Sequence, residues 1–264
     1  MMLVESIITQ GRKLESALNQ ALLRLRDTTD NEALHDVRIN LRRLRSLLRP
    51  LRDTHGASQL DNAAAKLGRI TTPIRDLEVL IIELDQHQLT WQANTRKTEL
   101  QSRKLALTSL PLLIRLPTLL HAWLSIFLKT QHRHTKHHIA HHLNRQVKQL
   151  RLALADAHYD RHRLRLLVKH LRYVVDTYPQ FTLITPEAIA HLKTAQNTLG
   201  HWHDHVVWYQ MAEHQQDLWP LLPQWRSTIA IAQENAEAAL LLLSQTLSGT
   251  GKKHARYHNP DKLA

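Results

Sequence analysis

Apolar residues recur along most of this chain at intervals of three to four positions. Leucine and valine share one helical face between residues 34 and 48, and again between residues 164 and 175. Such spacing is typical of amphipathic helices, whereas strands alternate with a period of two. Glycine occurs only six times, and alternating β-branched runs are almost absent. The pattern predicts an all-α fold in which long helices pack as bundles.

Three short motifs predict where helices begin. Thr29 followed by Glu32 has the spacing of a capping box. The pairs Thr72-Pro73 and Thr185-Pro186 each combine an N-cap residue with proline at the first helical position. We therefore expect helices to start at these three places.

A row of basic residues on the polar side of the helices occurs twice. Each row begins with histidine and continues with cations at i+3, i+7 and i+10. On a helix these positions form a stripe about 80° wide and about 15 Å long. Like charges at this spacing repel each other, so folding alone does not favour the row, and a polyanion would neutralise it. The first ridge comprises His35, Arg38, Arg42 and Arg45, and the second ridge comprises His162, Arg165, Lys169 and Arg172.

The two halves of the chain align at an offset of about 127 residues. Besides the ridges, residues 72–76 align with residues 200–204, and an apolar run follows each segment. This internal duplication predicts one helical bundle at 1–135 and a second at 136–247, related by pseudo-two-fold symmetry. Residues 248–264 have no apolar face, and we expect a disordered basic tail there.

Composition supports a phosphate-rich partner. The formal net charge is +12, and the chain has 20 histidines and no cysteine. Arginine dominates the first ridge, which Arg49 and Arg52 extend, and its planar guanidinium binds phosphate oxygens in pairs. The start of the chain lacks signal-peptide features, and two prolines and an arginine interrupt the apolar segment 110–128. These features predict a soluble, cytoplasmic protein without a membrane span.

Four motifs in this order resemble the CHAD domain family, a family of α-helical domains named for conserved histidines. The motifs are "LHDVRINLRRLRSLLRPLR", "IRDLEVL", "RHRLRLLVKHLRYVVDTY" and "TLGHWHD", and the resemblance covers about residues 10–245. It implies two helical bundles around a basic cavity or channel. It also implies binding of inorganic polyphosphate without catalysis or cofactor, and a location on polyphosphate granules would fit such a module.

The resemblance also implies which residues form the site. The first ridge matches the family's first motif, and the second ridge with Tyr173 matches the second motif. Arg75 and Asp76 match the family's Arg-Asp pair, while His203 and Asp204 lie where the family is looser. We expect Asp76 and Asp204 to orient basic side chains, because a carboxylate repels phosphate. Thr72 replaces a glycine often seen before the Arg-Asp pair, which leaves the local turn open.

Five histidines share one helical face before the second ridge, and Arg145 and Lys148 continue that face. The stripe could be a plain polar face or a pH-dependent extension of the anion surface, to which we assign Arg145 and Lys148. His137 and His141 have the i,i+4 spacing that can hold zinc or nickel, but no carboxylate within the stripe completes such a site. The histidines are His134, His137, His138, His141 and His142.

Two other functions fit parts of the sequence. Nucleic acid would satisfy the positive charge, although no known DNA-binding motif is recognisable. A metal-dependent phosphohydrolase would need paired carboxylates or a glycine-rich phosphate loop, and neither pattern is present. The six tryptophans are scattered and not interleaved with the ridges, which favours core positions over base stacking. Sequence alone specifies neither polyphosphate chain length nor oligomeric state.

Overall fold

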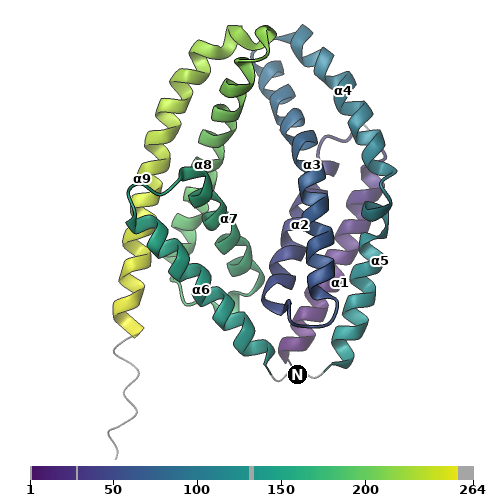
Figure 1. The fold of residues 1–264 in the computed structure, drawn as a ribbon, viewed down its shortest axis with the longest axis vertical. Helices are drawn as coiled ribbons and strands as arrows, with labels where there is room; N and C mark the ends of the chain where they lie inside the picture. The colour runs from purple at the N-terminus through teal and green to yellow at the C-terminus, as the bar shows by residue number, and fades with distance from the viewer. Residues whose placement is uncertain (1, 28, 131–133, 255–264) are drawn as a thin grey trace, which may run out of the picture. The chain divides into compact units, whose positions relative to one another are not determined.

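The computed structural model describes residues 2–27, 29–130 and 134–254, with side chains up to residue 248. Within these residues every regular element is helical, which confirms the all-α prediction. Figure 1 shows the helices in chain order. The long helices are α1 (Met2–Arg24), α2 (Ala33–Leu48), α3 (Ala57–Gln86), α4 (Thr90–Thr108), α5 (Pro111–Lys129), α6 (Thr135–Ala155), α7 (Arg161–Thr177), α8 (Pro186–Ala212) and α9 (Leu222–His254).

The chain divides into two compact units, Met1–Ile139 and Ala140–Ala264. The division lies inside α6, a few residues after the boundary that the sequence suggested at 135. The pseudo-two-fold relation and the shared basic cavity concern both units together, and both stay predictions.

In the first unit, α2 packs against α1 on one side and α3 on the other. Helix α3 also contacts α4, and α5 packs on α1 and α3. The apolar face of α2 supplies fully buried side chains, including Leu34, Val37 and Leu44. Burial of one such side chain contributes about 1.5–3 kcal/mol. The buried side chains fix the orientation of α2, and its basic stripe runs beside the apolar face, with Arg38 buried against α3.

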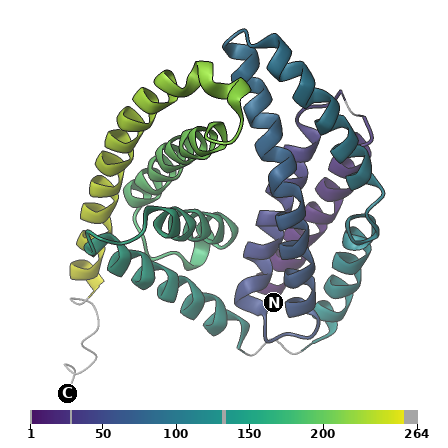
Figure 2. The same ribbon diagram turned by 45° about the horizontal axis from the view of Figure 1, so that its top comes forward.

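In the second unit, α7 packs on α8, and α8 and α9 form an antiparallel pair joined by the 3₁₀ helix η3 (Gln216–Leu221). Figures 1 and 2 show α9 descending along the outside of this unit. Leu164, Val168 and Leu171 bury the apolar face of α7. A buried tryptophan pair, Trp208 of α8 and Trp225 of α9, joins the two long helices at 5.8 Å between ring centroids.

Of the six tryptophans predicted to lie in the core or at helix seams, three are buried, Trp202 is half-buried and two are exposed. Trp123, Trp208 and Trp225 are buried, whereas Trp91 and Trp219 are more than half exposed. Trp91 lies in the first turn of α4. Trp219 lies in η3, where its indole N–H donates to the carbonyl of Ala212 at 3.0 Å.

One of the three expected helix starts is confirmed. Thr185 caps α8, and its hydroxyl accepts from the backbone N–H of Ala188 at 3.2 Å. The expected capping box at Thr29 is wrong, because Asp30 performs the role. Its carboxylate accepts from the backbone N–H groups of Glu32 and Ala33 at the start of α2.

The expected start at Thr72-Pro73 is also wrong, because Pro73 lies inside the continuous helix α3. A helical proline cannot donate to the carbonyl four residues earlier, and its ring crowds the preceding turn. In that turn the hydroxyl of Thr71 donates to the carbonyl of Leu67 at 2.9 Å, and that of Thr72 donates to the carbonyl of Gly68 at 2.8 Å. The carbonyl that Pro73 leaves without a helical donor is that of Arg69, so the two hydroxyls bond other carbonyls of the same turn.

The C-terminal segment is helical as far as it is described. Helix α9 continues through residue 248 to His254. The expected disorder of residues 248–264 stays a prediction. The rest of the expected tail, 255–264, lies outside the described residues.

Helix α5 is the one described helix that is long and apolar enough to cross a membrane by length and composition. Its buried side chains, among them Leu116, Leu120 and Phe127, pack into the first unit. A core helix passes the same length and composition test.

Candidate functional site

The first ridge lies on α2, and its neighbours on α3 complete a basic cluster within the first unit. Arg38 is the most buried cation of this ridge, with 9% of its surface exposed. Its Nη1 donates to the hydroxyls of Thr71 and Thr72, each at 3.0 Å, and more weakly to the carbonyl of Gly68 at 3.4 Å. These acceptors are all neutral, so Arg38 is held in place without a hydrogen-bonded carboxylate.

Burial and neighbouring cations raise the energy of the charged form of Arg38. Desolvation, followed by the charge of Arg42, lowers the pKa of Arg38 to about 10, and Asp76 opposes this shift. Its Nε is buried without a hydrogen-bond partner among the described residues. Arg38 stays charged at neutral pH, and an approaching anion would supply a hydrogen-bond acceptor and negative charge beyond that of Asp76.

His35 at the head of the ridge belongs to the same cluster. Burial, together with the charges of Arg75 and Arg42, lowers its pKa, while Glu32 and Asp36 act in the opposite direction. His35 is therefore neutral in the free protein at pH 7, and the positive charge of this cluster comes from arginine.

Further along α2, a buried carboxylate of α3 organises the arginines. Asp61 is fully buried and accepts from Arg45 Nε at 3.0 Å and from Arg52 Nε at 3.0 Å, with a further contact from Arg52 Nη2. Arg49 lies beside this group, and desolvation with the charge of Arg45 lowers its pKa to about 10. The sequence analysis missed Asp61, although its position in the first turns of the helix after the ridge makes it a candidate partner.

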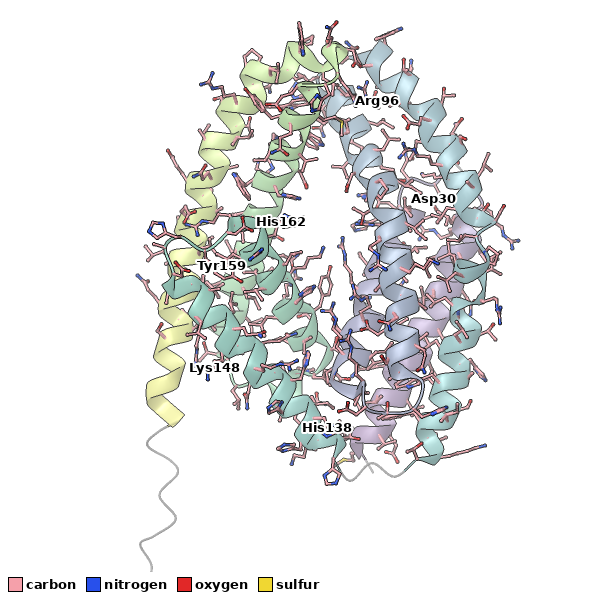
Figure 3. All side chains as sticks on the ribbon, viewed as in Figure 1. Asp30, Arg96, His138, Lys148, Tyr159 and His162 are labelled. Atoms are coloured by element: carbon pink, nitrogen blue, oxygen red, sulfur yellow. The ribbon has the colours of Figure 1, made fainter. Side chains whose placement is uncertain are left out.

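A second buried carboxylate, Glu78, holds Arg75. Arg75 Nη1 donates to Glu78 Oε2 at 3.0 Å, and Lys104 of α4 lies 2.7 Å from Glu78 Oε1. Side-chain exposure is 3% for Glu78 and 1% for Lys104. Lys104 also reaches the carbonyl of Asp30 in the loop before α2, at 3.4 Å. Figure 3 labels Asp30, which lies between α1 and α2 in the chain.

The orienting role expected of Asp76 stays a prediction, and the network adds a second carboxylate, Glu78, to the cluster. Asp76 is exposed, and it acts on Arg38 by its charge, in line with an orienting role. The carboxylate that bonds Arg75, however, is Glu78, which lies three residues along α3. The motif "IRDLEVL" contains Glu78, but only the structure shows that it faces inward toward Lys104.

In the second unit, the second ridge lies on α7 and meets His203 of α8. The rings of His162 and His203 lie 5.0 Å apart between centroids. Desolvation lowers the pKa of His203 to about 4, and the charges of Arg165, His162 and Lys169 add to that effect. Figure 3 labels His162 at the start of α7. The low pKa of His203 therefore reflects its burial first and the nearby cations of α7 second.

The remaining members of this ridge lie further along α7. Arg172 Nε is 3.7 Å from the carboxylate of Asp176, one turn onward, and Tyr173 is half-buried beside it. At the other end, Asp160 caps α7 by accepting from the backbone N–H of Arg163 at 2.8 Å. Asp204 is half-buried on α8, next to His203 in sequence, and its orienting role stays a prediction.

The histidine stripe lies on the first half of α6. His137, His141, Arg145 and Lys148 are exposed, and the assignment of Arg145 and Lys148 to the anion surface stays a prediction. Within the part of the chain that is described, no three histidine or acidic side chains gather in a metal-binding group. The i,i+4 pair of His137 and His141 thus gains no third ligand there.

Two comparisons bear on identity. The model of the CHAD domain family matches residues 12–213 of this chain. A crystal structure of the CHAD domain from the plant Ricinus communis matches with a TM-score of 0.69 and 21% identity, covering 93% of this chain and 91% of that one. Curated proteins offer no match. The structural match shows a shared fold, the family match spans most of the sequence, and the chain belongs to the CHAD domain family.

Proposed function

We propose that this protein binds inorganic polyphosphate through the two ridges and acts as a binding module rather than an enzyme. The observation that carries the proposal is Arg38. It is a buried guanidinium held by neutral oxygens, with an unsatisfied Nε and a lowered pKa. The charges of Asp76 and Glu78 only partly offset this lowering, and a phosphate oxygen would supply further negative charge and a hydrogen-bond acceptor.

A linear polyanion suits the arrangement better than a single phosphate. The cations of each ridge recur at intervals of about 5 Å along a helix, so successive phosphate groups can meet successive side chains. Clusters occur in both units, with lowered pKa values at Arg38 and Arg49 in the first and at His203 in the second. One chain of phosphates would relieve the repulsion among several of these groups at once.

A non-catalytic role is supported by the carboxylates themselves. Asp61 and Glu78, the buried acids near the first ridge, already bind arginine and lysine side chains. An acid engaged in this way holds a cation in position and is not available as a general base. Their role is to orient the anion-binding arginines.

The test is a titration of long-chain polyphosphate into the whole protein at several salt concentrations. Affinity should fall steeply with salt, because binding releases counterions. Arg38→Ala and Arg172→Ala should each weaken binding about tenfold, since each removes charge-assisted hydrogen bonds. Exposed arginines of the same two helices, Arg43 and Arg163, provide matched controls, and their alanine variants should bind nearly as well as the original.

Nucleic acid is the competing ligand, and competition separates the two. Protein loaded with polyphosphate should retain it in excess duplex DNA at equal phosphate concentration. Displacement by DNA would favour a nucleic-acid module. Unchanged polyphosphate affinity after both ridges are neutralised would overturn the proposal, and so would release of orthophosphate that Asp76→Asn abolishes.

A further inference from the structure

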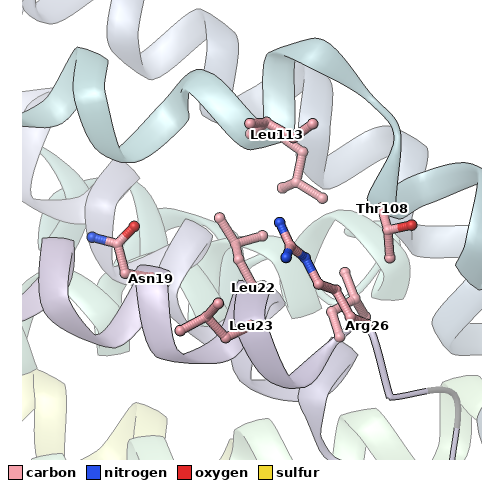
Figure 4. A pocket seen from close by; sticks show the side chains of 8 residues that line it. Asn19, Leu22, Leu23, Arg26, Thr108 and Leu113 are labelled. Carbon is pink, nitrogen blue, oxygen red and sulfur yellow. The ribbon is translucent and has the colours of Figure 1, made fainter.

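A cavity of about 300 Å³ lies between α1, the end of α4 and the start of α5 in the first unit, outside both ridges. Its walls are aliphatic and come from Leu22, Leu23 and Leu25 of the α1 region and from Leu113 and Ile114 of α5. The volume falls at the lower end of the range of small-molecule sites, which is about 300–1,000 Å³. Figure 4 shows the cavity and its labelled side chains.

One cation enters this apolar space. The guanidinium of Arg26 points across the cavity between Leu22 and Leu113 (Figure 4). The polar lining is completed by the amide of Asn19 and the hydroxyl of Thr108, and none of the described lining residues carries a carboxylate. An arginine among leucines presents hydrogen-bond donors at one end of an apolar surface.

Two neighbouring cavities of similar size show that this arrangement is specific. The cavity of about 310 Å³ further along α1 and α5 contains Arg12, but also Glu15, which bonds His121 at 3.1 Å. The cavity of about 280 Å³ between α1 and α2 contains Arg24 paired with Asp36. Both of those linings include a carboxylate, and the lining around Arg26 does not.

The mouth of the Arg26 cavity is also apolar. Leu23 is 64% exposed and Ile114 is 55% exposed. Large aliphatic side chains that flank a cavity lose contact with water when an apolar ligand enters, and this favours binding. The guanidinium of Arg26 and the aliphatic walls would therefore both be satisfied by a ligand with an anionic head and an alkyl tail.

We propose that this cavity binds an amphipathic monoanion of the alkyl carboxylate class, with the carboxylate on Arg26 and the alkyl chain between α1 and α5. The guanidinium matches a carboxylate through two parallel hydrogen bonds. The amide of Asn19 offers a further donor, and the leucine walls cover the alkyl chain. The site is independent of the polyphosphate proposal, because none of its lining residues belongs to either ridge.

The test is a calorimetric and NMR titration of the whole protein with octanoate. Octanoate should bind saturably, whereas octylammonium, which has the same tail and the opposite charge, and acetate, which lacks the tail, should not. Arg26→Gln should weaken octanoate binding about tenfold or more. Arg12→Gln, the matched control in the neighbouring cavity, should leave octanoate affinity unchanged.

Two exposed positions keep the result interpretable. Arg26 and Ile114 both lie at the surface, so Arg26→Gln and Ile114→Ser should fold, as circular dichroism can verify. Ile114→Ser should also weaken octanoate. Equal binding of octylammonium, unchanged octanoate affinity in Arg26→Gln, or competitive displacement of octanoate by polyphosphate would each overturn the proposal. Loss of polyphosphate binding in a ridge variant that still binds octanoate would bear only on the proposed function.

Discussion

The two ridges share one sequence pattern but have different electrostatic surroundings. In the first unit, α3 supplies two buried carboxylates, Asp61 and Glu78, that hold cations around α2. In the second unit, α8 places His203 among the cations of α7, and none of the described carboxylates there is buried. Ion pairs with buried carboxylates thus hold the cations of the first cluster. In the second cluster, burial and the nearby cations keep His203 neutral at pH 7.

The largest effect should come from removing Glu78. Glu78→Gln leaves Lys104 buried without its negative partner and releases Arg75, and it should cost about 3–5 kcal/mol in the free energy of unfolding. Urea unfolding followed by circular dichroism measures this loss. The double variant Glu78→Gln/Lys104→Met should recover most of it, because the unpaired buried charge is gone. A single-variant cost below about 1 kcal/mol would mean that the network does not stabilise the first unit.

Asp61 should have the next largest effect. Asp61→Asn keeps the side-chain shape but removes the charge that pairs with the partly exposed Arg45 and Arg52, and it should cost about 2 kcal/mol. The matched change in the second unit is Asp176→Asn, which breaks a surface pair and should cost less than about 0.5 kcal/mol. Equal costs in a urea unfolding experiment would contradict the contrast between the two units.

The histidine of the second unit predicts a pH dependence. His203 takes up its proton with a pKa of about 4 in the folded protein, against 6.5 for a free histidine. The unfolded chain therefore binds this proton first, and the second unit should lose stability as pH falls from about 6.5 to 4. A bound polyanion would offset the charges of Arg165, His162 and Lys169 and raise the pKa of His203.

Polyphosphate affinity should accordingly rise as pH falls from about 6.5 toward 4. Calorimetry in two buffers of different ionisation enthalpy measures the protons taken up on binding. His203→Gln should reduce that uptake, whereas His191→Gln, a change to another histidine on α8, should not. Polyphosphate binding without proton uptake at pH 5.5 would show that the bound anion does not change the pKa of His203.

The smallest effect concerns the starts of the two ridge helices. Asp160 caps α7 directly, and Asp160→Ala should cost about 1 kcal/mol. Glu32, the N-cap residue of α2, makes no side-chain capping bond, and Glu32→Ala should change stability by less than about 0.3 kcal/mol. Asp30→Ala should cost at least as much as Asp160→Ala, because Asp30 bonds the first N–H groups of α2 and also pairs with Arg24. Thermal unfolding curves of the three variants rank these costs.

The helices and the ridge positions could be predicted because both depend on local periodicity. Leu34 and Val37 mark the apolar stripe of α2, and His35 and Arg38 mark a basic stripe beside it. The burial of Arg38 depends on α3 and could not be predicted. Partners such as Asp61 and Lys104 could not be predicted, since only packing between helices decides which acid meets which base. Asp30 and Pro73 show the limit for local motifs. At α2 the capping side chain is that of Asp30, one position after the expected Thr29. Helix α3 continues through Pro73, so no helix begins at Thr72.

Pro73 removes one backbone hydrogen bond from α3 next to the threonines that contact Arg38. Thr71 and Thr72 lie in the turn before Pro73, and both accept hydrogen bonds from Arg38. Their hydroxyls also donate to the carbonyls of Leu67 and Gly68. When Arg38 turns toward a phosphate, the turn loses part of its support, and when the turn opens, Arg38 loses its anchor. Amide hydrogen exchange in α3 just before Pro73 should therefore change when polyphosphate binds, so this helix would report occupancy of the first ridge through its own backbone.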